Sequence, residues 1–213
     1  MVKKIIITGG LGYIGTELCK LYSGYSWHHK IIVVDNRFVS ERVNQIRNWN
    51  MEFIHGDILD KDTVKKYFKD ADVVHHLAGI TDVPRIKSES LSEVDKKIKL
   101  VAEEGTQNIL DVISDKCKII FPSTHVVYEG IEKVKNNIKE EEATKPVLSY
   151  SSSKAVNENQ LKKSGKNYVI LRLGSVYGYS TDTTRLDIMP NLFSKIASQD
   201  GTLKLFSGGR QIK

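Results

Sequence analysis

The sequence has 213 residues, 40% of them hydrophobic and 27% charged, and its 32 Lys and Arg against 26 Asp and Glu give a formal net charge of +6. This length and apolar content predict one globular domain with part of a second, and they exclude a disordered or fibrous chain. The longest apolar runs are far shorter than the ~18 residues of a membrane-spanning helix, so we expect no membrane partner.

The start of the chain and its cysteines favour a cytoplasmic protein. The first residues lead into a strand-like run without the apolar segment and cleavage site of a secretory signal. Cys19 and Cys117 are too few for a disulfide framework or a metal cluster, and we interpret them as buried thiols. Because basic residues alternate with acidic ones, we expect a small anionic ligand rather than nucleic acid.

Short β-branched runs alternate with segments of helical spacing. The strands are expected at Lys3–Thr8, Lys30–Asp35, Met51–Ile54, Asp72–His76, Lys118–Phe121 and Tyr168–Leu173. The helices are expected at Tyr13–Leu21, Ser40–Arg47, Asp62–Phe68, Leu91–Ile113 and Ser149–Lys163. This alternation predicts an α/β fold, a doubly wound parallel sheet with helices on both faces.

The pattern changes after Leu173. An irregular segment rich in Gly and Thr precedes a predicted helix over Pro190–Ser198 and a strand-like run at Thr202–Phe206. We therefore expect a first domain over residues 1–175 and the start of a smaller second domain over 176–213. One helix and one strand have little to pack against, so we expect the sequence to be a truncated piece of a longer protein.

A glycine-rich turn joins the first strand to the first helix. Gly9, Gly12 and Gly15 have G-x-x-G-x-x-G spacing, which permits a tight turn and a close approach of the backbone to a pyrophosphate. Tyr13 and Ile14 lie at the head of the helix, where amide groups and the helix dipole favour an anion. The alternative is a glycine-rich turn in an unrelated α/β protein.

Carboxylates follow the second and third strands. Asp35 has the spacing from the glycine turn at which a carboxylate accepts both ribose hydroxyls of an adenosine. Its charge would repel a 2′-phosphate and so favours NAD over NADP, whereas Arg37 nearby argues the other way. Asp57 either reaches the adenine amino group or caps the next helix. We also expect the neighbouring Asn36 and Ile58 in the cofactor site.

A phenol and an ammonium group lie one helical turn apart at Tyr150 and Lys154. An ordinary phenol pKa is near ~10, but the Lys154 cation and a positively charged nicotinamide would both favour the phenolate, making Tyr150 a usable proton acceptor. A surface pair is the alternative. Thr124 places a hydroxyl at the carboxyl edge of the sheet, where open α/β folds bind ligands.

Seven blocks resemble, in order and spacing, the extended short-chain dehydrogenase/reductases, specifically the NAD-dependent epimerase/dehydratase family with its UDP-glucose 4-epimerase-like enzymes. They are TGGLGYIG (8–15), VVDN (33–36), GDI (56–58), HHLAG (75–79), PSTHVVYEG (122–130), YSSSK (150–154) and LRLGSVYG (171–178). The resemblance implies a Rossmann domain and a role in carbohydrate metabolism. It implies that Thr124 holds the reacting hydroxyl, Tyr150 is the acid/base and Lys154 binds the nicotinamide ribose. Leu77, Ala78 and Gly79 would line the NAD.

Some positions depart from the family pattern. His125 and Val126 stand where dehydratases have an Asp-Glu pair, which argues against 4,6-dehydration. His125 is either a supplementary acid/base or a polar loop residue. Ser175 replaces an Asn that touches the sugar diphosphate in many members, and Lys213 stands where the family often has a diphosphate-binding Arg. We expect both to contact substrate.

These features predict an NAD-dependent nucleotide-sugar epimerase, an isomerase in which hydride leaves the sugar and returns on the other face. The alternatives are a reductase or dehydrogenase of the same family and a non-catalytic NAD-binding fragment. Helices 91–113 and 149–163 are expected to form a homodimer seam, as in family members. His75 and His76 lack carboxylate or Cys partners at ligand spacing, so we interpret them as structural and expect no metal.

Overall fold

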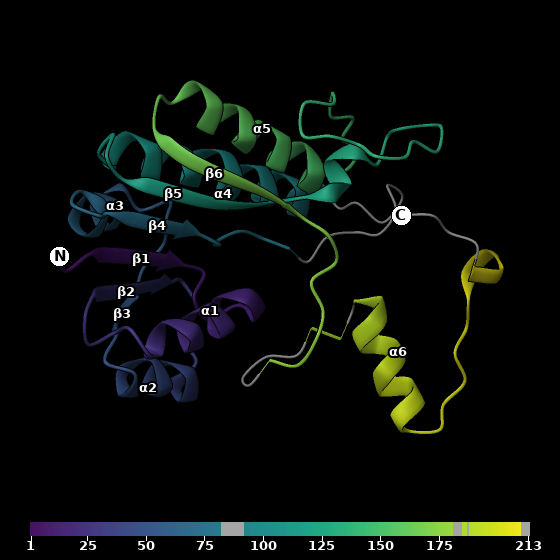
Figure 1. Cartoon of the computed structure of the whole chain (residues 1–213), viewed down its shortest axis with the longest axis horizontal. Coiled ribbons are helices and arrows are strands. Elements are labelled where there is room, and N and C mark those ends of the chain that lie inside the picture. Colours follow the sequence, from purple (N-terminus) through teal and green to yellow (C-terminus); the bar gives the residue numbers. More distant parts are fainter. Residues whose placement is uncertain (82–91, 181–184, 187, 210–213) are drawn as a thin grey trace.

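Six parallel strands form one sheet in the order β3-β2-β1-β4-β5-β6 (Figure 1). The computed structural model describes residues 1–81, 92–180, 185–186 and 188–209. The strands are β1 (Lys4–Thr8), β2 (Lys30–Asp35), β3 (Glu52–His55), β4 (Val73–His76), β5 (Lys118–Thr124) and β6 (Asn167–Leu173). The order reverses between β1 and β4, which is where ligands bind in open α/β sheets. The predicted doubly wound sheet is confirmed.

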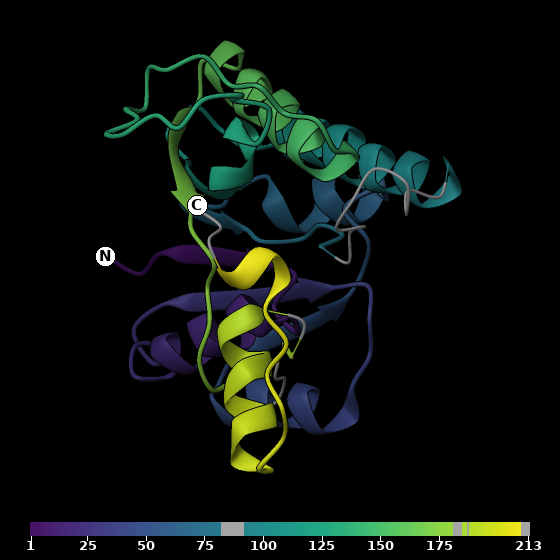
Figure 2. The same cartoon turned by 90° about the vertical axis from the view of Figure 1, so that its right-hand side faces the viewer.

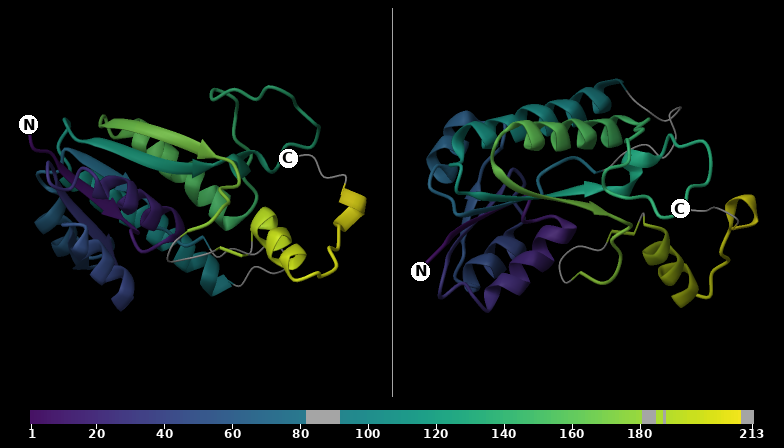
Figure 3. Two further views of the ribbon diagram at one scale, coloured as in Figure 1. Left: turned by 60° about the horizontal axis from the view of Figure 1, so that its bottom comes forward. Right: turned by 45° about the horizontal axis from the view of Figure 1, so that its top comes forward.

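Helices cover both faces of the sheet. They are α1 (Tyr13–Ser23), α2 (Ser40–Asn48), α3 (Lys61–Phe68), α4 (Ser92–Val112), α5 (Ser149–Lys163) and α6 (Met189–Ser198), with short 3-10 helices η2 (His125–Tyr128) and η3 (Phe206–Gly209). The right-hand view of Figure 3 shows α4 and α5 above the sheet and α1 and α2 below it. No helix of the described residues is long and apolar enough to cross a membrane.

The core lies on both sides of the sheet because neighbouring strand residues point to opposite faces. Ile6 of β1 belongs to the cluster that contains Phe68 of α3 and Leu161 of α5. Ile7, the next residue, belongs to the cluster that contains Ile46 of α2. Burial on both faces explains why these strands are almost continuously apolar.

β5 is three residues longer than predicted, since it runs to Thr124 although Pro122 lies within it. The register explains this: β4 pairs with β5 only as far as His75 opposite Ile120. Beyond that point β5 has β6 as its partner, so the missing N–H of Pro122 interrupts no ladder on the β4 side. The longer strand carries Thr124 to the end of the sheet.

The predicted strand at Thr202–Phe206 is wrong. Residues 201–205 have no regular structure, and Phe206–Gly209 is a 3-10 helix. Strand formation depends on pairing and packing as well as on β-branched composition, and no described strand pairs with this segment. The nearby helix α6 begins one residue before the predicted Pro190, and no side chain in it is buried.

Helix α6 lies beyond the carboxyl ends of the strands (Figure 1), and Figure 2 shows it on the α1 side of the sheet. Polar contacts join it to the segment after β6 and to the start of α1. Asn191 accepts the Gly178 N–H at 2.9 Å and approaches the Tyr13 hydroxyl at 3.4 Å. Tyr13 in turn donates to the Gly178 carbonyl. The start of α1 is thereby joined to the segment that follows β6.

Candidate active site

The glycine turn leaves the N-terminus of α1 open. Gly9 has φ +66°, and a Cβ there would lie 2.8 Å from the Ala78 backbone nitrogen. A Cβ on Gly15 would overlap the Gly9 carbonyl oxygen. Gly12 is the N-cap and offers no side chain to the first N–H groups of α1, and the first turn carries no acidic residue. These free donors and the bare backbone fit a dinucleotide pyrophosphate.

Asp35 lies directly beside this turn and is only 6% exposed. Its Oδ2 accepts the Leu11 N–H at 2.9 Å and its Oδ1 accepts the Arg37 N–H at 2.9 Å. The carboxylate therefore fixes the glycine turn against the end of β2. The spacing of Asp35 in the sequence predicts that an adenosine ribose binds at this edge of the sheet.

Asn36 and Asp57 are brought together, because Asn36 Nδ2 donates to Asp57 Oδ2 at 3.0 Å. The N-cap of α3 is Asp60, so the alternative that Asp57 caps this helix is wrong. Asp57 Oδ1 instead accepts the Leu59 N–H at 2.9 Å. Ile58 is 5% exposed, and its side chain packs in the core against Gly105 of α4.

A buried hydrogen-bond chain holds the 77–79 loop against the turn. The Thr8 hydroxyl accepts the Ala78 N–H at 3.0 Å and also forms a hydrogen bond with His76 Nδ1 at 3.1 Å. His76 Nε2 forms a second hydrogen bond, with the Thr106 hydroxyl at 2.9 Å. Burial, helped by the charge of Lys154, lowers the pKa of His76 to about 3, so the ring is neutral. His76 thereby positions the loop that was expected to line the cofactor.

Tyr150 and Thr124 meet at the carboxyl edge of the sheet. The Thr124 hydroxyl lies beside the Tyr150 phenol, and its oxygen accepts the Val126 N–H at 3.3 Å. Burial raises the pKa of Tyr150, while the charge of Arg185 and the hydrogen bond with Thr124 lower it, and burial prevails. A further positive charge beside the phenol would favour the phenolate and so oppose the effect of burial.

Lys154 lies one turn further along α5. Its ammonium donates to the Pro122 carbonyl at 2.8 Å and lies 4.4 Å from the Phe121 ring centroid and 5.9 Å from that of Tyr150. Burial lowers the pKa of Lys154 to about 8. The structure thus brings together the three residues expected to be catalytic. The hydroxyl of Thr124 and the ammonium of Lys154 both lie near the phenol of Tyr150.

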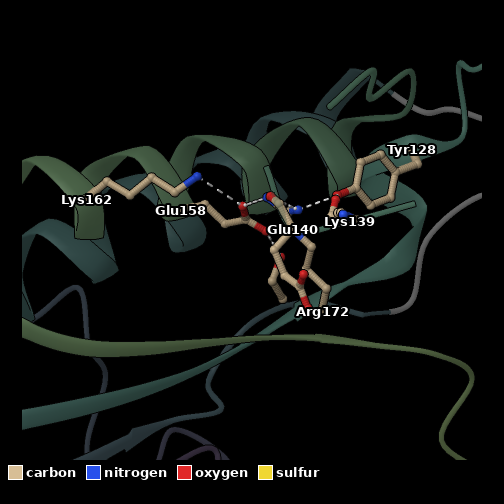
Figure 4. Close-up of polar contacts among 7 residues, drawn as sticks. Tyr128, Lys139, Glu140, Glu158, Lys162 and Arg172 are labelled. Carbon is tan, nitrogen blue, oxygen red and sulfur yellow. Dashed lines mark hydrogen bonds and ion pairs between the residues drawn. The ribbon is translucent and has the colours of Figure 1, made fainter. Parts of the chain in front are cut away.

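Glu158, a further turn along α5, anchors this helix (Figure 4). It is 2% exposed and accepts the Ser123 hydroxyl at 2.6 Å and the Arg172 Nε and Nη2 at 2.9 and 2.6 Å. Lys162 adds an ion pair at 3.7 Å. Burial favours protonation of Glu158, but the hydrogen bonds and charges of these partners hold its pKa below the ordinary value.

Arg172 extends the same network to the segment before α5. It donates to the Glu140 carbonyl at 2.9 Å and to the Tyr128 hydroxyl, which itself donates to the Lys139 carbonyl at 3.2 Å. Sequence reasoning missed the Glu158–Arg172 pair. Its signals were a Glu four residues after Lys154 and an Arg inside an apolar strand.

The remaining expected residues lie at the same edge or outside the described part. His125 Nδ1 lies 3.1 Å from the Leu173 carbonyl, so the Nδ1–H donates and Nε2 is left as an acceptor. Ser175 is exposed, two residues after the end of β6. Lys213 lies outside the described residues. No group of three or more described His, Cys, Asp or Glu side chains could hold a metal.

The profile of the "NAD dependent epimerase/dehydratase family" matches residues 5–213. The chain belongs to this family. It is 29% identical to the dTDP-D-glucose 4,6-dehydratase of Dictyostelium discoideum over 83% of this chain and 44% of that protein. It is also 29% identical to a UDP-glucose 4-epimerase of Neisseria meningitidis over 75% of this chain and 48% of that protein. The chain thus spans about half the length of these curated relatives.

Solved structures of family members share the fold. A mutant UDP-glucuronic acid 4-epimerase from Bacillus cereus, in complex with UDP-4-deoxy-4-fluoro-glucuronic acid and NAD, superimposes with a TM-score of 0.79. It is 25% identical, and the match covers 97% of this chain and 66% of that chain. A UDP-glucose 4-epimerase from Brucella ovis in complex with NAD gives a TM-score of 0.66 at 28% identity, over 85% and 55% of the two chains. The predicted Rossmann fold and NAD-dependent family are confirmed.

Proposed function

We propose that this chain binds NAD and forms the catalytic half of a nucleotide-sugar epimerase. The observation that carries the proposal is the position of the Thr124 hydroxyl beside the Tyr150 phenol at the carboxyl edge of the sheet, with the Lys154 ammonium 5.9 Å from the centroid of the phenol ring. A domain that only bound a dinucleotide would have no chemical need for this trio. The solved relatives in complex with NAD and with a uridine nucleotide sugar support the ligand classes.

Different residues of this chain would contact different parts of the cofactor. The open N-terminus of α1 would bind the pyrophosphate, Asp35 would accept the adenosine ribose hydroxyls, and Lys154 would donate to the nicotinamide ribose. Bound NAD supplies a reversible hydride acceptor. Burial alone disfavours the phenolate of Tyr150, and the positive charge of a bound nicotinamide would oppose this effect.

Tyr150 then acts as the base on the sugar. The phenolate removes the proton of the reacting hydroxyl, and Thr124 donates a hydrogen bond to the same oxygen. The phenol returns the proton after the sugar has turned over in the site. Because the hydride would return to the same carbon, the cycle would have no net redox change. We further propose that residues 176–213, attached through Asn191, begin the unit that holds the sugar nucleotide, with Ser175 among its contacts.

The proposal extends to the oligomeric state and the cellular compartment. Leu100 of α4 and Val156 of α5 are 43% and 37% exposed on helices that pack together, which supports a homodimer through these helices. The two buried free thiols, Cys19 and Cys117, support a reducing compartment such as the cytoplasm.

The first measurement is the binding of NAD to the chain. Calorimetric titration of the chain with NAD should give saturable binding, and nucleotide sugars supplied with NAD should be epimerised without accumulation of NADH. Tyr150→Phe should lower turnover by about 10²–10⁴-fold while NAD still binds. Tyr25→Phe, at a tyrosine that is 61% exposed, is the matched control. Full activity of Tyr150→Phe would remove the phenol from the mechanism, and stoichiometric NADH would favour the dehydrogenase alternative.

A further inference from the structure

A closed set of hydrogen bonds joins helix α6 to the first residue of α1. Asn191 Oδ1 accepts the Gly178 N–H at 2.9 Å, and Asn191 Nδ2 lies 3.4 Å from the Tyr13 hydroxyl oxygen. The Tyr13 hydroxyl donates to the Gly178 carbonyl, so both backbone groups of Gly178 have partners. Gly178 has φ +128°, a conformation that L side chains rarely adopt. We call Tyr13, Gly178 and Asn191 the clasp.

The clasp is also linked to a second part of the proposed cofactor site. Asn191 Nδ2 donates to the Arg185 carbonyl at 2.7 Å. The Arg185 side chain in turn donates from Nη2 to the Thr81 carbonyl at 3.1 Å. Thr81 follows the 77–79 loop that was expected to line the NAD. One side chain of α6 is thus connected both to the head of α1 and to the segment after β4.

Directional contacts, rather than apolar burial, determine where α6 lies. No side chain of α6 is buried, so its packing specifies its position only weakly. The clasp depends on the position of the Tyr13 hydroxyl, because hydrogen bonds weaken steeply with poor geometry. Tyr13 directly follows Gly12, the N-cap of α1, at the helix start where the free amides would bind a pyrophosphate. An anion bound there would restrict the first turn of α1 and with it the Tyr13 hydroxyl.

We propose that Tyr13 and Asn191 are positioning residues that couple occupation of the dinucleotide site to the order of α6. The inference rests on the proposed dinucleotide function. An ordered first turn of α1 holds the Tyr13 hydroxyl in the geometry that Gly178 and Asn191 require, so bound NAD would favour the closed clasp. A coupling of this kind is reciprocal. The start of the second unit would therefore take its place beside the first domain mainly when the cofactor is present.

The experiment is hydrogen–deuterium exchange of the whole chain, followed by mass spectrometry, with and without saturating NAD. The readout is the exchange rate of peptides within residues 189–198, which contain α6 and none of the residues expected to contact the dinucleotide. We expect NAD to slow this exchange by about 5- to 10-fold in the wild-type protein. Tyr13→Phe and Asn191→Leu, which remove hydrogen-bonding groups but keep a similar shape, should each reduce the effect of NAD to less than about twofold. A merely structural contact would speed exchange equally with and without NAD and leave the ratio unchanged.

Ser194→Ala is the matched control. It removes a side-chain hydrogen bond within α6, from Ser194 Oγ to the Pro190 carbonyl at 2.8 Å, and should keep the wild-type ratio. Isothermal titration calorimetry verifies that NAD saturates each protein. If NAD binds but does not slow exchange in α6 of the wild-type protein, or if the Tyr13 and Asn191 variants keep the wild-type ratio, the inference is overturned and the proposed function stands. If the wild-type protein does not bind NAD, the proposed function fails and the inference fails with it.

Discussion

The carboxylate of Glu158 offers a quantitative test of how the reactive helix is held in place. It is 2% exposed and binds Ser123, Arg172 and Lys162 at once, while the Arg172 side chain is 14% exposed. Glu158→Gln keeps the shape but leaves the Arg172 charge largely buried without a counter-charge. Loss of one partner from a buried ion pair costs about 3–5 kcal/mol, so we expect a decrease of about 3 kcal/mol in the free energy of unfolding.

The assay is urea unfolding followed by circular dichroism, with Glu52→Gln as the matched control. Glu52 forms an ion pair with Lys30 at 3.6 Å in which both side chains are exposed, 44% and 59%, so its loss should cost about 0–1 kcal/mol. A double variant that also replaces Arg172 with Met should be less destabilised than the two single changes added together, because no buried charge is left unpaired. Equal effects of Glu158→Gln and Glu52→Gln would refute the reasoning.

The same carboxylate predicts a pH dependence. The partners hold the pKa of Glu158 in the folded chain below its ordinary value, so the unfolded chain binds the proton more readily. The stabilisation is therefore present above the unfolded pKa of about 4.3 and is lost as the pH falls through the lower folded pKa. Glu158→Gln should abolish this part of the acid sensitivity, measured by urea midpoints between about pH 3 and 6.

Other changes test the remaining parts of the site. Gly9→Ala should abolish calorimetric NAD binding, because a Cβ would lie 2.8 Å from the Ala78 nitrogen at a φ of +66°, and retained affinity would contradict this. Lys154 has its pKa lowered to about 8 when folded, so wild-type stability should rise between about pH 8 and 10 and Lys154→Met should lose that rise in urea titrations. Leu100→Glu and Val156→Glu should convert a dimer to monomer in light scattering, whereas an unchanged mass would place the interface elsewhere.

Features that depend on neighbouring residues were predictable from the sequence. The glycine turn, the position of Asp35 at the end of β2 and the bounds of α5 all follow from local spacing and strand-helix alternation. Thr124 could be placed at the carboxyl edge of the sheet because it follows a strand, and Tyr150 and Lys154 could be placed on one face of a helix by their spacing. The family resemblance joined the three residues in one site. Here local preference and the final fold agree.

Features that depend on tertiary pairing were not predictable. Pro122 marks a strand end locally, but it is tolerated inside β5 because β4 stops pairing at His75. Thr202–Phe206 has strand composition without a described strand to pair with it. The Glu158–Arg172 pair joins a helix to an adjacent strand, and no local pattern specifies which buried charges meet.

Three polar networks converge on the reactive edge of the sheet. His76 is held by Thr106 and in turn holds Thr8, which is hydrogen-bonded to the 77–79 loop. Glu158 fixes α5 two turns beyond Tyr150. Glu129 fixes the start of α5, since its Oε1 accepts the N–H groups of Val147 and Leu148 at 2.7 Å each. Apolar packing could hold α5 on the sheet but would tolerate small shifts along it. Directional hydrogen bonds at both ends of the reactive segment restrict those shifts, which is what proton transfer between oxygens at hydrogen-bond distance requires.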